Sequence, residues 1–180
     1  MEAKVIAVNI NPDHSFSKTP VKEIKLIVGQ GVEGDAHMGE KVKHRSRVRQ
    51  NPDQPNLRQV HLIHKELFDE LRLQGHPIEP GQIGENITTE NIELLALPRG
   101  TKLKLGPEAE IEITGLRNPC QQLNDFQAGL MDKLIYKNEA GELIRKSGIM
   151  AVVTKSGKVS AGDRIRITLP QKPYKKLDRV

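Results

Sequence analysis

Short runs of alternating apolar and polar residues dominate the chain and are separated by turn residues. Alternation with a period of two is typical of a β-strand that turns one face to the core. The runs with this pattern are 5–10, 24–28, 60–63, 102–105, 109–114, 149–154 and 164–169. Their spacing predicts a mainly β fold. Because closing a sheet hides its edges, we expect a closed, barrel-like sheet.

Helical spacing of apolar residues is confined to two stretches. The first, 64–74, predicts one helix. The second predicts a helix from about 119 to about 136, because Leu123, Phe126 and Leu130 recur every three or four positions. We expect these few helices to lie at the periphery of the sheet.

The segment 29–58 is long and largely without periodicity. A loop of that length inside a compact domain is usually functional or disordered. No proline-rich or Gly/Ser-rich linker divides the chain, and 180 residues fit one domain. We therefore expect a single domain over 1–170, followed by a basic C-terminal tail over 171–180.

The formal net charge is +5, and the basic residues concentrate in 41–49 and 172–180. Nucleic acid is a usual partner for such charge, but single-strand binding adds stacking aromatic side chains, and Tyr174 is the only aromatic residue in either segment. This composition disfavours nucleic acid, whereas a small anionic ligand accounts for the charge. A solvated loop and a disordered tail are the structural alternatives.

The chain shows no sign of a membrane segment. No apolar run reaches the ~18 residues that a membrane-spanning helix needs. The N-terminus carries charges among its apolar positions and alternates like a strand, unlike a signal peptide. A single cysteine cannot form an internal disulfide, so nothing indicates an oxidising compartment. We expect a cytoplasmic protein.

Cys120 is the only cysteine, and the residues before it favour a reactive thiol. A strand-like run ends at Gly115, and Asn118 and Pro119 are typical of a helix cap and a first helical residue. In that frame Cys120 lies in the first helical turn, where backbone N–H groups and Arg117 stabilise a thiolate. Such a thiol is a candidate nucleophile, soft-metal ligand or sulfur carrier. The alternative is a small buried apolar side chain without chemistry.

The segment 29–39 combines several glycines with Asp35 and His37. Glycines such as Gly34 and Gly39 allow sharp turns that present backbone N–H groups to an anion. Asp35 and His37 are close enough in the chain to orient a ligand or each other. The alternative is a structural turn in which Asp35 caps backbone groups.

A second glycine turn, 80–89, runs into a strand-like segment and contains Gly84, Glu85 and Asn86. The amide of Asn86 offers donors and an acceptor, which suits recognition of the edge of a heterocycle. Stabilising the turn is the alternative role for this side chain.

His61 and His64 raise the question of a zinc site, because they are three positions apart. A junction between a strand and a helix would point the two rings in different directions, and zinc sites normally have tighter ligand spacing. We therefore interpret them as ordinary core or surface histidines.

Four motifs follow one another along most of the chain: 34–39, 59–62, 80–87 and 117–120. Together, and in this order, they resemble the MOSC family, the C-terminal domain of molybdenum cofactor sulfurases, and most of all its short stand-alone bacterial members. The resemblance implies a barrel-like fold with few helices and a pocket for the molybdenum cofactor, molybdopterin. By position, it assigns cofactor binding to Gly34, Asp35, His37, Gly39, Gly84, Glu85, Asn86 and Arg117, and the catalytic and metal-ligating role to Cys120.

The resemblance further implies either sulfur transfer or a molybdoenzyme, with Cys120 as persulfide carrier or metal ligand. A sulfur carrier needs a donor, such as a desulfurase, and an acceptor protein. Full-length sulfurases also carry a pyridoxal phosphate domain. Since this chain begins directly with a strand, we expect that domain to be absent and the chain to depend on another desulfurase.

Three other functions stay open from the sequence. One is a reductase of N-hydroxylated compounds that uses the bound molybdenum cofactor. Another is a non-catalytic basic β-barrel that binds nucleic acid. The third is a Cys/His hydrolase in which His37 or His61 acts as the base for Cys120.

Overall fold

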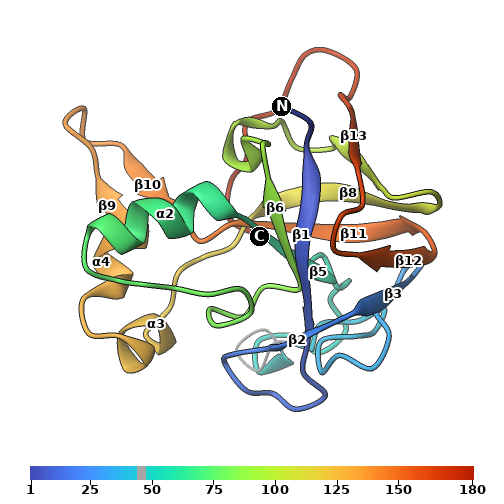
Figure 1. Ribbon diagram of the computed structural model, residues 1–180, viewed down its shortest axis with the longest axis horizontal. Coiled ribbons are helices and arrows are strands. Elements are labelled where there is room, and N and C mark those ends of the chain that lie inside the picture. The colour runs from blue at the N-terminus through green and yellow to red at the C-terminus, as the bar shows by residue number, and fades with distance from the viewer. Residues whose placement is uncertain (44–47) are drawn as a thin grey trace.

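The computed structural model describes residues 1–43 and 48–180, and one eight-stranded sheet forms its centre (Figure 1). The strands in spatial order are β13 (Ile165–Thr168), β7 (Lys102–Leu105), β8 (Ala109–Leu116), β11 (Ile149–Lys155), β5 (Val60–His64), β6 (Ile87–Glu90), β1 (Lys4–Ile10) and β2 (Thr19–Val21). Neighbouring strands are antiparallel except β5 and β6, which are parallel. The mainly β class is confirmed, and each strand predicted from the alternation overlaps an observed strand.

The remaining described strands form two smaller sheets. The first consists of β12 (Gly157–Ser160), β3 (Glu23–Ile27) and β4 (Gly31–Val32), and the second is the hairpin of β9 (Ile135–Lys137) and β10 (Leu143–Arg145). The helical elements that the structure describes outside residues 44–47 are α2 (Lys65–Leu73), α3 (Gln122–Phe126), α4 (Leu130–Leu134) and the 3-10 turn η1 (Leu94–Ala96). The three α-helices and the β9–β10 hairpin lie together on one side of the sheets (Figure 1).

Alternation along the strands produces the main core. In β8, Ala109, Ile111 and Ile113 are fully buried, whereas Glu110 and Glu112 between them are only partly buried. The inward residues of the large sheet pack with those of β3 and β12 in one apolar cluster. A second cluster joins α2 to α3 and α4. The site described below lies on the loops between these two packed regions.

Closure of the large sheet into a barrel is not confirmed. The end strands β13 and β2 do not pair with each other within the described ranges. One isolated bridge joins Lys4 to Arg164, and the backbone N–H of Val5 donates to the carbonyl of Asp163. No ladder follows, because the rest of this edge of β1 pairs with β2.

The predicted helix at 64–74 is confirmed as α2, but the predicted helix after Pro119 is wrong in its extent. It is divided into α3 and α4, each of five residues. Gly129 separates them with a φ of 81°, a left-handed conformation that does not continue a right-handed helix. The chain then enters β9 instead of continuing as a helix.

The C-terminal segment is packed against the end of β8 and is not a disordered tail. The N–H of Leu116 donates to the carbonyl of Asp178 over 2.8 Å, and Leu177 is buried in the main core. Gly115 permits this approach, because a Cβ there would overlap the carbonyl of Asp178 and lie 3.0 Å from the Cβ of Val180. A domain boundary near residue 170 stays a prediction.

Two further expectations concern membrane-spanning helices and the basic loop. In the described part of the chain, no helix has both the length and the apolar character needed to cross a membrane. The predicted basic loop 41–49 is described only in part, because residues 44–47 lie outside the described residues.

Candidate functional site

A cavity of about 760 Å³ lies where several loops meet. Loops that follow β1 and β8 line it, together with His61 of β5 and residues just before β6. Of the predicted site residues, those that line the cavity are His37, Gly84, Asn86, Arg117 and Cys120. The structure therefore brings the thiol, the arginine before it and parts of both glycine loops to one place.

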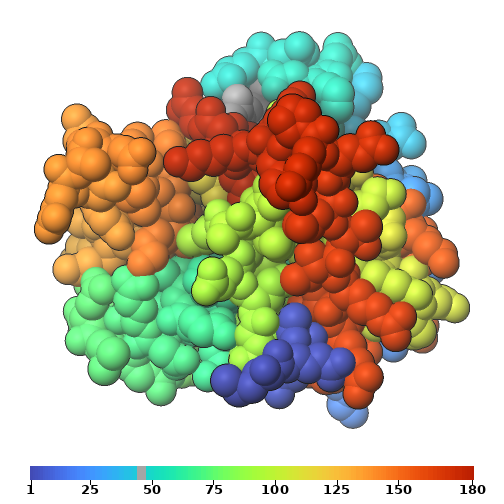
Figure 2. Space-filling model, turned by 90° about the horizontal axis from the view of Figure 1, so that it is seen from above, coloured from blue at the N-terminus to red at the C-terminus, as the bar shows by residue number. Residues whose placement is uncertain are grey.

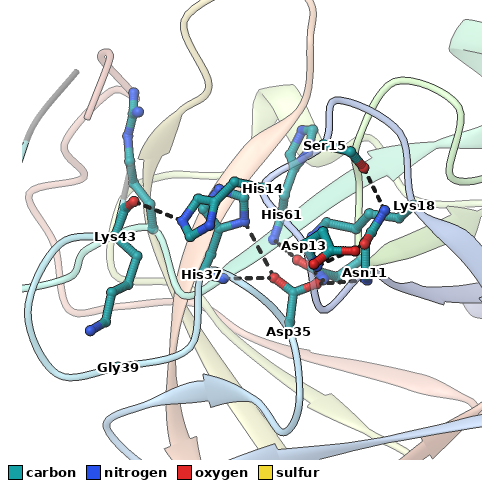
Figure 3. A network of polar contacts seen from close by, with 12 residues as sticks. Asn11, Asp13, His14, Ser15, Lys18, Asp35, His37, Gly39, Lys43 and His61 are labelled. Atoms are coloured by element: carbon teal, nitrogen blue, oxygen red, sulfur yellow. Dashed lines mark hydrogen bonds and ion pairs between the residues drawn. The ribbon is translucent and has the colours of Figure 1, made fainter. Parts of the chain in front are cut away.

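Asp35 is the centre of a polar network under this cavity (Figure 3). Its side chain is 2% exposed and accepts hydrogen bonds from the Lys18 ammonium, from the Asn86 amide over 3.1 Å, and from the backbone N–H of His37 over 3.0 Å. Burial raises the pKa of Asp35, but the hydrogen bonds from His37 and the charge of Lys18 outweigh it and hold the pKa below its usual range. Asp35 thus orients its neighbours and does not face a ligand.

Lys18 is a site residue that the sequence analysis missed. Its side chain is 5% exposed, pairs with Asp35 and lines the cavity. The loop that carries it is held by Asn11, whose amide donates to the carbonyl of Ser17 over 3.0 Å. A lysine in a polar loop between two strands carries no sequence signal that separates it from a solvated residue.

Arg117 joins the cavity to the second glycine turn. Its guanidinium donates to the carbonyl of Ile83 over 2.9 Å and lies 5.7 Å from the centre of the Phe16 ring. Burial lowers the pKa of Arg117, while Cys120 and Glu85 raise it. An arginine stays protonated in proteins, so a permanent positive charge lies beside the thiol.

Cys120 is partly exposed in the cavity, and its Sγ lies 3.5 Å from Oε1 of Gln122. It precedes the cap of α3, which begins at Gln122. The predicted position in the first turn of a helix is therefore wrong, and a helix of five residues offers little dipole. Arg117 is the cationic group beside the thiol.

The second glycine loop is built differently from what its sequence suggests. Glu85 is fully buried and does not line the cavity, and it accepts hydrogen bonds from the N–H of Gly81 and the hydroxyl of Thr88. Burial raises the pKa of Glu85 to about 7. Gly84 lines the cavity at a φ of 89°, and a Cβ there would lie 2.6 Å from the carbonyl of Phe16.

Asn86 connects the two loops rather than offering a free amide. Its Oδ1 accepts the backbone N–H of His61 over 3.1 Å, and its Nδ2 donates to Asp35 and to the carbonyl of Asn9. Gly34 and Gly39 also shape their loop without lining the cavity. These residues position the cavity wall.

His61 and His64 lie in different surroundings. His61 is buried, which lowers its pKa well below the usual value, and its Nε2 lies 2.8 Å from the carbonyl of Ser147. His64 lines a different cavity. Among the described residues, no three His, Cys, Asp or Glu side chains gather as candidate metal ligands.

The charge of the cavity is uniform among its described lining residues. The cations that line it are Lys18, Arg49, Arg58, Arg117 and Arg179, and no aspartate or glutamate does. The described residues thus place a partly exposed thiol and several cationic side chains in one cavity.

The MOSC domain profile matches residues 33–166. The chain therefore belongs to the MOSC domain family. No curated protein matches it.

Solved structures share the fold. The chain is similar to the YuaD protein from Bacillus subtilis, with 25% identity, a TM-score of 0.75 and coverage of 95% of this chain and 98% of that one. YiiM from Geobacillus stearothermophilus has 18% identity and a TM-score of 0.68, with 97% and 79% covered. YiiM from Escherichia coli has 22% identity and a TM-score of 0.62, with 97% and 73% covered.

Proposed function

We propose that this chain binds a molybdenum cofactor in the basic cavity, with Cys120 as the ligand of its metal or as a carrier of sulfur for it. The observation that carries the proposal is the convergence of Cys120, Arg117 and Lys18 on one cavity. These residues come from loops after β8 and after β1. Asp35 holds Lys18 in place, and the carbonyl of Ile83 holds Arg117.

The residues present fit such a group. Molybdopterin is an anionic pterin with a phosphate, and the volume of about 760 Å³ lies within the usual range for small-molecule sites. Lys18 and Arg117 would hold the anionic groups, and the Cys120 thiolate is a soft ligand suited to molybdenum. Because other candidate metal ligands do not gather in the described part of the chain, a metal held by Cys120 needs further ligands from a cofactor.

When bound, the cofactor supplies a redox-active metal. The chain supplies the surroundings: Cys120 would bind through Sγ, and Arg117 would balance negative charge there. Burial lowers the pKa of Lys18, and the ion pair with Asp35 opposes this and holds the ammonium in place. The lone thiol has to stay reduced for either role, so the proposal places the protein in a reducing compartment such as the cytoplasm.

In the sulfur-carrier role, the Cys120 thiolate attacks the outer sulfur of a persulfide on a donor desulfurase. The S–S bond of the donor breaks, a new S–S bond forms on Cys120, and the donor leaves as a thiolate. A thiolate of an acceptor protein then attacks the outer sulfur on Cys120, a new S–S bond forms on the acceptor, and Cys120 leaves as a thiolate. Arg117 supplies a positive charge near Sγ during this exchange.

Reduction of N-hydroxylated compounds is a second role for the same site. The cavity is partly open and Cys120 is partly exposed in it, so a small substrate can reach the thiol. The convergence of the cations inside a cavity favours a small anion over a polynucleotide, which needs a basic surface with stacking platforms.

The proposal is tested on protein purified from cells that make the cofactor. Molybdenum is measured by elemental analysis, and the pterin by its fluorescence after oxidation. Wild-type protein is expected to contain both, Cys120→Ser to lose the metal, and Lys18→Met to lose pterin. Lys25→Met removes an exposed lysine outside the cavity and serves as the control. Wild-type protein with no pterin, no molybdenum and no persulfide on Cys120 contradicts the proposal.

A further inference from the structure

Cationic side chains line both the buried end of the cavity and its exposed part. Lys18 is buried and Arg117 partly buried, and both lie at the end that holds Cys120. Arg49 and Arg179 also line the cavity but are exposed, and Arg58 is intermediate. The positive charge therefore continues from the buried part of the cavity to its solvent-facing mouth.

The arginines at the mouth are held by a packed junction. The Nε of Arg58 donates to the carbonyl oxygen of Val180 over 2.6 Å, and the N–H of Val180 donates to the carbonyl of Leu116 over 3.2 Å. Arg179 forms a bridge with Leu116, and Gly115 provides the space for the C-terminal segment. Figure 2 shows this segment, in red, crossing the surface toward the cyan segment around residue 50. The side chain of Arg58 and the backbone of Arg179 are thus held near the end of the strand that leads to Arg117.

We propose that Arg58 and Arg179, together with Arg49, form a second anion subsite, which binds a phosphate group of the ligand. This inference rests on the proposed function, because that function places the reacting part of the ligand near Cys120. An arginine offers several N–H donors in a planar fork that matches two oxygens of a phosphate. Several arginines at one mouth also attract anions from solution.

The phosphate has two sources with the same chemistry. It belongs either to a phosphorylated substrate that enters through the mouth or to a cofactor extended by a second phosphate. A substrate phosphate has to bind protein that already contains the cofactor, whereas a cofactor phosphate competes for the same place. Binding to loaded and to cofactor-free protein therefore separates the two.

The experiment measures the affinity of the full chain for inorganic pyrophosphate by titration calorimetry. Arg179→Gln is compared with Arg166→Gln, which removes the same charge from an exposed position on β13 outside the cavity. Arg179→Gln is expected to weaken binding about tenfold, as for loss of a charge-assisted hydrogen bond. Arg166→Gln is expected to stay within about twofold. Binding that persists in loaded protein assigns the subsite to substrate, and binding seen only in cofactor-free protein assigns it to the cofactor.

Gly115→Ala provides a second variant that keeps every charge. It is expected to weaken pyrophosphate binding by displacing the C-terminal segment. Equal effects of Arg179→Gln and Arg166→Gln would mean that only net charge matters and would overturn the proposal. The comparison of Arg179→Gln with Arg166→Gln is also made on cofactor-free protein. It therefore tests the subsite even if wild-type protein contains no molybdenum and no persulfide on Cys120.

Discussion

The buried ion pair of Lys18 and Asp35 should stabilise the site strongly. Replacing Lys18 by Met keeps an unbranched side chain of similar volume but removes the charged donor to Asp35. The carboxylate is 2% exposed and would stay buried without its counter-ion. We expect the free energy of unfolding to fall by several kcal/mol.

The expected loss in the free energy of unfolding depends on the hydrogen-bond donors to Asp35 that remain in Lys18→Met. Asp35 still accepts from the amide of Asn86 and from the backbone N–H groups of His37 and Asn11, at 3.0–3.3 Å. Breaking a buried pair by removing one partner costs roughly 3–5 kcal/mol. Because these neutral donors continue to solvate the carboxylate, we expect the lower end, about 3 kcal/mol.

Urea unfolding with linear extrapolation measures the loss. Lys25→Met breaks an exposed pair with Glu33, 3.1 Å apart, and should cost less than about 1 kcal/mol. The folded pKa of Asp35 lies below its unfolded value of about 3.9, so its contribution is present above that value and is lost as the pH falls through the folded pKa. Equal losses in Lys18→Met and Lys25→Met at neutral pH would refute the reasoning.

Two further predictions concern the second glycine loop. The folded pKa of Glu85 is raised to about 7, so the native state holds the proton more tightly than the unfolded chain and wild-type stability should fall as the pH rises from about 4.3 to above 7. Glu85→Gln should remove that fall and be more stable than wild type at pH ~8 by about 3–4 kcal/mol in urea unfolding, and an unchanged pH profile would disprove the assignment. Gly84→Ala should cost about 1–3 kcal/mol more than Gly75→Ala, since both glycines have positive φ but only at Gly84 does a Cβ meet another carbonyl, that of Phe16. Thermal unfolding checks this difference, and equal costs would mean that the close approach is unimportant.

The strands could be predicted because burial of one sheet face leaves a direct trace in the sequence. In β8 the alternation of Ala109, Ile111 and Ile113 with glutamates is visible without a structure. The break at Gly129 could not be placed, because the apolar spacing continues across it. Closure of the sheet also depends on which strand takes the free edge of β1, and no local pattern encodes that choice.

The site could be predicted where its chemistry is rare and not where it is common. Cys120 and Arg117 stand out in sequence, and the structure places them in one cavity. Lys18 was missed because its burial results from a loop held by Asn11 and from a partner far away in the chain. Glu85 stands between two cavity-lining residues in the sequence, Gly84 and Asn86, but its buried side chain accepts a hydrogen bond from the N–H of Gly81. Side-chain direction in a glycine turn depends on backbone geometry that residue types alone do not specify.

Native mass spectrometry of the intact chain, purified from cofactor-producing cells, tests the central claim most directly. It detects both a bound molybdenum cofactor and a sulfur atom added to the thiol. The account predicts one of these mass increments on wild-type protein and its absence from Cys120→Ser purified in parallel. Wild-type protein that carries neither, or a Cys120→Ser protein that carries the same increment, would contradict the assignment of Cys120 as metal ligand or sulfur carrier.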